Sequence, residues 1–87
     1  MPRPQPIPLM EAALVRQLRA KAVRGGLDFE ARLVVGAGVV LTRGQVRLGV
    51  WRWREGEFEF SRSVAGPALF KARTLLGAAA YTSSVVE

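Results

Sequence analysis

The sequence predicts an α+β fold, a single small domain in which one helix, three or four antiparallel strands and a second helix follow one another. Both helices are expected on one face of a twisted sheet. Three observations lead to this prediction: strong helix formers fill residues 9–24, a period-two apolar pattern runs through residues 27–41, and residues 50–60 alternate about a central Glu-Gly turn. The length of 87 residues allows one core. We therefore expect residues 9–87 to form one domain.

The first eight residues differ from the rest because the run PRPQPIP alternates proline with other residues. Proline lacks an amide donor and favours an extended, polyproline-like conformation. We interpret residues 1–8 as an extended proline-rich arm that leads stiffly into the first helix. A PxxP ligand for another protein is the alternative.

The predicted helix over residues 9–24 has two unlike faces. At about 100° per residue, its apolar side chains share one stripe, while arginines lie behind it. The stripe consists of Met10, Leu14, Val15, Leu18 and Ala22. One face therefore belongs to a core and the other is cationic. Gly25 and Gly26 are expected to end the helix, since glycine accepts the left-handed conformation of a C-cap.

Residues 27–41 carry an apolar side chain at every odd position and mostly polar or small residues at even positions, as in a half-buried antiparallel strand. The stretch is long for one strand, so a bend or bulge at Gly36 and Gly38 is expected to divide it in two. The following TRGQ run predicts a tight turn. In this register Leu41 pairs with Val46, and Val39 pairs with Leu48.

A second hairpin is predicted about the Glu55-Gly56 turn. It places four aromatic rings on one side of the sheet and two pairs of opposite charge on the other. The predicted pairs are Arg54 with Glu57, Trp53 with Phe58, Arg52 with Glu59 and Trp51 with Phe60. Arginines that face glutamates favour a structural charge ladder over a phosphate-binding patch.

The two tryptophans do not follow the alternation of the residues before them. In the predicted strand Val46 and Leu48 point inward at even positions, whereas Trp51 and Trp53 occupy odd positions, which would point outward. A bulge near Gly49 would send both indoles into the core, and this is the favoured interpretation. Without a bulge the rings would emerge on the second face and mark a partner site. That alternative interface consists of Trp51, Trp53, Phe58 and Phe60.

The second helix is predicted to begin at Pro67 and to continue through residues 68–81, because proline is tolerated at a first helical position. Its inner face would contain Leu69, Ala72, Leu76 and Ala79. Residues 82–87 could fray or add an edge strand. The predicted core comprises Leu14, Leu18, Phe29, Leu33, Val39, Leu48, Trp53, Phe58, Leu69 and Leu76.

The residue types present leave few routes to catalysis. The sequence contains neither cysteine nor histidine, so it lacks thiolate ligands, the commonest metal ligand and the side chain best suited to proton transfer near neutral pH. The serines have no histidine to activate them, and the carboxylates lie beside arginines. We expect a non-enzymatic protein without catalytic residues, cofactor or metal.

The charge balance favours a polyanionic partner, because thirteen Lys and Arg against seven Asp and Glu give a net charge of +6. Once the charge pairs of the second hairpin are set aside, eleven cations remain, and nine of them, with no nearby acidic residue apart from Glu11, form the candidate set. They are Arg16, Arg19, Lys21, Arg24, Arg43, Arg47, Arg62, Lys71 and Arg73. A protein that follows a nucleic-acid backbone needs hydrogen-bond donors from several helices, strands and turns, and these nine cations are spread in that way. We therefore expect a nucleic-acid-binding module of low sequence specificity, with DNA and RNA both open.

The order of helix, strands and helix resembles the double-stranded RNA-binding domain, and also the small toxins that share its topology. The resemblance covers element order alone. The lysine cluster that such domains carry at the second helix is reduced here to Lys71 and Arg73, and the histidine of the related nuclease toxins is absent. A fold-level likeness does not license a function.

The alternative function is a protein-interaction or assembly subunit, with a phage or another mobile element as its source. It would use a sheet edge or the exposed aromatic face and would form an oligomer. The longest apolar stretch, Leu33 to Leu41, is about half of the roughly 20 residues needed to cross a bilayer. We expect a cytoplasmic protein without a membrane partner.

Overall fold

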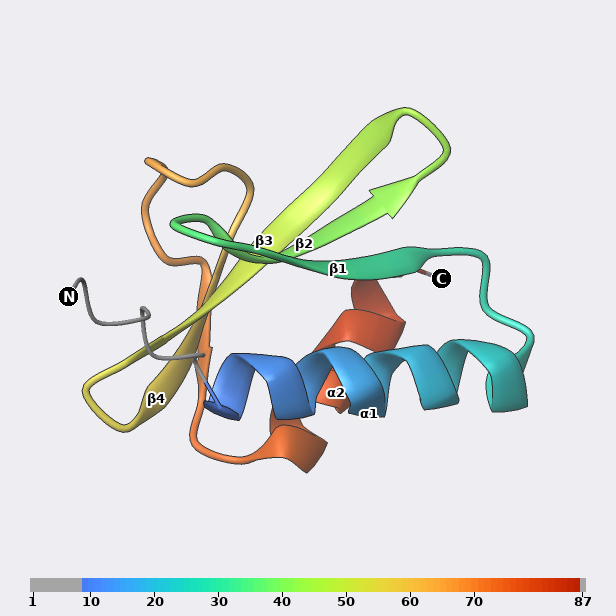
Figure 1. The fold of residues 1–87 in the computed structure, drawn as a ribbon, viewed down its shortest axis with the longest axis horizontal. Coiled ribbons are helices and arrows are strands. Elements are labelled where there is room, and N and C mark those ends of the chain that lie inside the picture. The colour runs from blue at the N-terminus through green and yellow to red at the C-terminus, as the bar shows by residue number, and fades with distance from the viewer. Residues whose placement is uncertain (1–8, 87) are drawn as a thin grey trace, which may run out of the picture.

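The computed structural model describes residues 9–86, which form a single antiparallel sheet and two helices that pack on it (Figure 1). The elements are α1 (Leu9–Gly25), β1 (Glu30–Val34), β2 (Gly38–Arg43), β3 (Val46–Arg54), β4 (Glu57–Ser61), β5 (Phe70–Ala72) and α2 (Leu75–Val86). The strands follow one another in the sheet as β1-β2-β3-β4-β5. The predicted α+β fold is confirmed, with a fifth strand beyond the three or four expected. The predicted proline-rich arm lies outside the described residues.

The first helix agrees with its prediction at both ends and on its buried face. Gly26 has a φ of 63°, and the Leu27 N–H donates to the Ala22 carbonyl at 3.0 Å, which closes the helix at its C-terminus. The buried apolar side chains of α1 are Leu14, Val15 and Leu18. The predicted division of the next stretch is also confirmed, since a turn at residues 35–37 separates β1 from β2.

The register predicted between β2 and β3 is wrong. Leu41 lies opposite Gly49 rather than Val46, and Val39 lies opposite Trp51. The register shifts between Leu41 and Thr42, so β3 carries one extra residue there. The extra residue reverses which positions of β3 face the core, so Trp51 points inward. This agrees with the favoured interpretation, a bulge near Gly49.

Gly49 has a packing reason to lack a side chain. A Cβ at this position would collide with the Phe60 ring at Cζ and Cε2. The ring of Phe60, which is buried, therefore lies directly over the backbone of β3.

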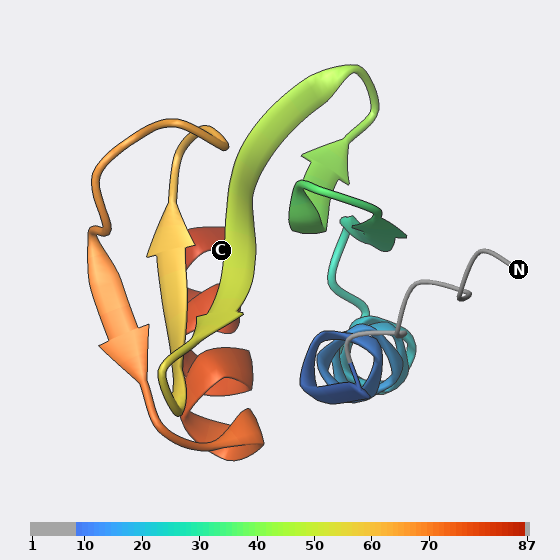
Figure 2. The ribbon, with the colours of Figure 1, turned by 60° about the vertical axis from the view of Figure 1, so that its left-hand side comes forward.

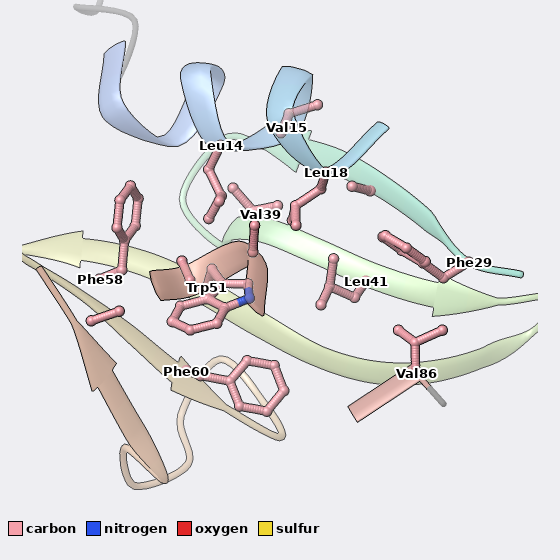
Figure 3. Close-up of a cluster of buried hydrophobic side chains, with 14 residues drawn as sticks. Leu14, Val15, Leu18, Phe29, Val39, Leu41, Trp51, Phe58, Phe60 and Val86 are labelled. Carbon is pink, nitrogen blue, oxygen red and sulfur yellow. The ribbon is translucent and has the colours of Figure 1, made fainter. Parts of the chain in front are cut away.

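The second hairpin pairs as predicted, with Trp51 opposite Phe60 and Trp53 opposite Phe58. Trp51 is fully buried at the centre of the core (Figure 3), and its indole Nε1 donates to the Thr82 hydroxyl of α2 at 2.9 Å. The rings of Phe58 and Phe60 are buried beside it, and Trp53 is partly buried against the same cluster. The alternative of a bare aromatic sheet face is therefore wrong, because these rings form the interior of the protein.

The start predicted for the second helix is also wrong. Residues 70–72 form β5, in which Phe70 lies opposite Phe60 and Ala72 lies opposite Phe58. The helix begins only at Leu75, where the hydroxyl of Thr74 accepts the Gly77 N–H at 3.0 Å and caps the first turn.

This later start changes which residues of the segment are buried. Leu69 and Leu76, both predicted in the core, are exposed, whereas Ala72 is buried from a strand and Ala79 from the helix. Residues 82–86 continue α2, so the expectation that this stretch frays or adds an edge strand is wrong. Leu33, Leu48 and Trp53, which were also predicted in the core, are partly buried and pack against the cluster of buried side chains.

Both helices lie against one face of the twisted sheet (Figure 2). Helix α1 contacts β1, β2 and β3, while α2 contacts α1 and β5. Strands β1 and β5 are the two edges of the sheet. Since α1 contacts β1, this helix lies toward the edge opposite β5.

Candidate nucleic-acid interface

The structure separates the nine predicted cations instead of gathering them on one surface. Arg16, Arg19, Lys21 and Arg24 lie on α1, and Arg43 and Arg47 lie on β2 and β3 beside the turn that joins them. Arg62, Lys71 and Arg73 belong to the loop after β4, to β5 and to the segment before α2. Since α1 packs toward the β1 side and β5 is the opposite edge, the α1 cations and the last three face different parts of the molecule.

Arg43 has a structural role that the sequence did not predict. Its Nε donates to the Asp28 carbonyl at 2.9 Å and lies 3.9 Å from the Asp28 carboxylate, while its terminal nitrogen donates to the Val86 carbonyl. The prediction that Arg43 has no acidic neighbour is wrong. Its guanidinium joins the end of α2 to the α1–β1 connection and also places a cation at a helix C-terminus, where the helix dipole favours it.

Lys71 also has an acidic neighbour. Its partner across β4 and β5 is Glu59, which lies opposite Arg52 on the other side. The predicted register of the hairpin charges is confirmed. Within residues 9–86, however, the one ion pair closer than 4.0 Å is that of Arg43 with Asp28. The hairpin charges therefore balance one another as neighbours across the strands, without contact ion pairs.

The four cations of α1, like Arg47, Arg62 and Arg73, have no carboxylate within ion-pair distance in the described part of the chain, but they are gathered on one helix. We call Arg16, Arg19, Lys21 and Arg24 the α1 surface. The acidic residue of this helix, Glu11, is nearly buried, and its Oε2 accepts the Trp53 N–H at 2.9 Å. Glu11 thus completes the β3 backbone hydrogen bonding and does not neutralise the α1 surface.

Two of these side chains are held by backbone carbonyls. Arg19 Nε donates to the Ala31 carbonyl of β1 at 3.0 Å, and Arg24 Nε donates to Ala20 of its own helix at 3.4 Å. A guanidinium has five N–H donors in a fixed plane, so each keeps donors that can bind an anion.

Open hollows flank the α1 surface on both sides. One of about 370 Å³ lies between α1 and β1 and is lined by Arg19, Val23, Phe29 and Arg32, together with Glu30. The other, of about 340 Å³, is lined by Lys21, Arg24, Leu27 and Ser83. Cations therefore line the hollows on both sides of α1.

Arg32 was missed by the sequence analysis as a candidate. It occupies an outward position of the period-two pattern and is exposed on β1. The alternation contained the necessary signal, but only the structure shows that this position lies in the same hollow as Arg19.

The length of the α1 surface suits a few phosphates. From residue 16 to residue 24 a helix rises roughly 12 Å. One duplex strand rises about 3.4 Å per phosphate along the duplex axis, so this length equals the rise of about three or four phosphates when α1 lies parallel to that axis.

Comparison of the chain with protein-family models, curated proteins and solved structures finds no match. Neither helix of residues 9–86 is both long and apolar enough to cross a membrane. In the same residues no group of three or more acidic side chains is placed to hold a metal ion. The likeness of element order to double-stranded RNA-binding domains is weakened by the fifth strand.

Proposed function

We propose that this protein is a small basic, non-enzymatic and cytoplasmic binding module whose α1 surface contacts nucleic-acid phosphates with little sequence specificity. The observation that carries the proposal is the α1 surface itself, four cations within one helix, none of which lies within ion-pair distance of a carboxylate of the described residues. Of the predicted cations, Arg43 and Lys71 have acidic neighbours and do not belong to this surface.

Arginine suits this task because its planar guanidinium makes two parallel hydrogen bonds to one phosphate. Arg19 is oriented in advance by its bond to the Ala31 carbonyl, so less side-chain freedom is lost when it binds. Arg16 and Lys21, which make no hydrogen bond within residues 9–86, supply charge that adapts to the position of the backbone.

Binding without base stacking on Trp51, Phe58 or Phe60 follows from where these rings lie. Proteins that hold single strands stack bases on exposed aromatic side chains. Here Trp51, Phe58 and Phe60 are buried, so they cannot serve as such a platform. Binding would then depend on phosphate charge, which is the same in every sequence.

The test is fluorescence anisotropy of a labelled duplex and a labelled single strand over a range of salt concentrations. Four phosphate contacts predict a slope of log K against log salt of about −3.6 for duplex DNA and about −2.8 for a single strand. The duplex affinity should then fall about 100-fold between 50 and 200 mM salt. Duplexes of unrelated sequence, as the control, should bind equally. Absence of binding at 50 mM salt, or a slope near zero, would contradict the proposal.

The protein-interaction alternative is favoured by a different observation. The β5 edge of the sheet is open, and Leu69 and Phe70 are exposed beside it. This region and the α1 surface are on different elements, so the two functions do not exclude one another.

A further inference from the structure

Strand β1 is an edge of the sheet, and two hydrogen bonds show which of its backbone groups point outward. Arg19 Nε of α1 donates to the Ala31 carbonyl, so this carbonyl points away from β2. The Val34 carbonyl accepts the Ala37 N–H of the β1–β2 turn, so it points toward β2. Backbone groups of successive residues in an antiparallel strand point to opposite sides. The N–H and C=O of Ala31 and Leu33 therefore point out of the sheet, and those of the even residues bond to β2.

The outward groups of β1 are a template for another strand, because an edge strand leaves its N–H and C=O groups unpaired. Arg19 occupies one of them, the Ala31 carbonyl, but a carbonyl oxygen has two lone pairs and can accept a second bond. Strand β5, the other edge, offers less. It is three residues long, and its Phe70 pairs with Phe60, whose carbonyl is directed toward β5.

An open hollow lies on each face of β1. The hollow between α1 and β1 has apolar walls from Ala22, Val23 and Phe29, and Val23 is 84% exposed. The second hollow, of about 350 Å³, lies on the face of the sheet that the helices do not cover. Its apolar lining includes Val34, Val40 and Val64. Side chains of a strand alternate between the two faces of a sheet, so an added strand would direct every second side chain into each hollow.

The charges beside this edge suit a polypeptide better than a nucleic acid. Glu30 and Arg32 are exposed, line both hollows and make no contact ion pair within residues 9–86. A polyanion that follows β1 would meet the Glu30 carboxylate. A polypeptide strand can instead place an opposite charge across from each of the two residues, and such cross-strand pairs are stabilising.

We propose that the β1 edge binds an extended segment of a partner protein, which pairs antiparallel with β1 and adds a sixth strand to the five of the sheet. The segment carries a carboxylate opposite Arg32, an apolar residue opposite Ala31 and a cation opposite Glu30. Its backbone bonds to the outward groups of β1 supply affinity, and its alternate side chains supply specificity. This partner is separate from the nucleic acid of the α1 surface.

Helix α1 supports the added strand from below. It lies alongside β1 (Figure 1) and contacts it. The apolar side chain opposite Ala31 points to the same face as Ala31, which is the face that α1 covers. There it would contact Ala22 and Val23 and remove the exposed valine from water.

The test is an NMR titration of the isotope-labelled full chain with two synthetic peptides, TVEVKVT and TVKVEVT, both capped at their ends. The peptides have the same composition and no net charge, so general attraction to the basic protein is equal for both. In the antiparallel register the first sets opposite charges across from Glu30 and Arg32, whereas the second opposes like charges. We expect TVEVKVT to bind about 3- to 30-fold more tightly. The largest shifts are expected at the amides of Ala31 and Leu33, which gain hydrogen-bond partners.

The matched protein variant is Glu30→Arg/Arg32→Glu, which exchanges the two exposed charges and keeps the net charge. Its preference should reverse, so that TVKVEVT binds more tightly. A TVEVKVT peptide with N-methylated valines tests the backbone pairing without any change in the protein, and it should bind at least about 10-fold more weakly because it lacks the N–H donors.

The proposal is overturned if TVEVKVT leaves the Ala31 and Leu33 amides unchanged up to about 1 mM peptide. It is equally overturned if both proteins prefer the same peptide, or if N-methylation has no effect. The exchanged variant keeps all four cations of the α1 surface, so nucleic-acid binding is measured independently. Failure of the peptide to bind therefore leaves the proposed function standing.

Discussion

Trp51→Ala is expected to lower the free energy of unfolding by about 3–5 kcal/mol, which is a large part of the ~4–13 kcal/mol typical for a domain of this length. The indole is fully buried and contacts several rings, including Phe60 at 5.1 Å and Tyr81 at 5.9 Å between centroids. Alanine would leave a cavity between the sheet and both helices. It would also remove the donor to Thr82, which joins β3 to α2.

The matched control is Trp53→Ala, the same change two residues along the same strand at a ring that is only partly buried. Urea unfolding followed by circular dichroism measures both variants. We expect the loss at Trp53 to be less than half of that at Trp51. Equal losses would mean that Trp51 is not the centre of the core.

Gly38→Ala is expected to destabilise the protein by about 2–5 kcal/mol, the sum of two costs. Gly38 has a φ of 104°, which residues with a Cβ rarely adopt. An added Cβ would also collide with the Trp51 carbonyl oxygen, a backbone atom that cannot move without disturbing β3. The predicted role of this glycine in dividing β1 from β2 thus has a steric basis.

Gly36→Ala separates the two costs of the Gly38 change. Gly36 also has a positive φ, of 84°, but its added Cβ would meet no atom within 4 Å. The loss there should be about 1–2 kcal/mol, the conformational cost alone. The two variants are compared by thermal and urea unfolding. If Gly38→Ala costs no more than Gly36→Ala, the collision with the β3 backbone is not present in solution.

The hairpin about Glu55-Gly56 could be predicted from the sequence because two patterns agree there. Aromatic residues and charges alternate in phase on both strands, so a single register satisfies both. The β2–β3 register could not be predicted in detail, since the extra residue of the bulge leaves no mark on composition. The change of phase between Leu48 and Trp51 showed only that a bulge was needed near Gly49.

The helix predicted from Pro67 failed for a tertiary reason. Residues 68–73 have adequate helix propensity, but Phe70 and Ala72 fill positions opposite Phe60 and Phe58 at the border of the sheet. Long-range pairing of this kind overrides local propensity.

The error in the helix also affected the candidate site. Lys71 was placed on a helix, away from Glu59, whereas the strand sets the two opposite one another. The contact of Arg43 with Val86 depends on where α2 ends, which the sequence does not reveal. The position of the four α1 cations on a helix could be predicted, because an uninterrupted amphipathic helix needs only its period to assign its faces.

The most direct test of the proposed function compares two triple variants in the anisotropy titration. Arg16→Gln/Lys21→Gln/Arg24→Gln removes most of the α1 surface and leaves Arg19, which is bonded to β1. Arg47→Gln/Arg62→Gln/Arg73→Gln removes three cations from other elements. Both lower the net charge equally. The α1 variant should reduce the magnitude of the duplex salt slope from about 3.6 to about 0.9, while the other should keep a slope close to wild type. Equal losses in the two variants would contradict the account, because binding would then follow total charge and not the α1 surface.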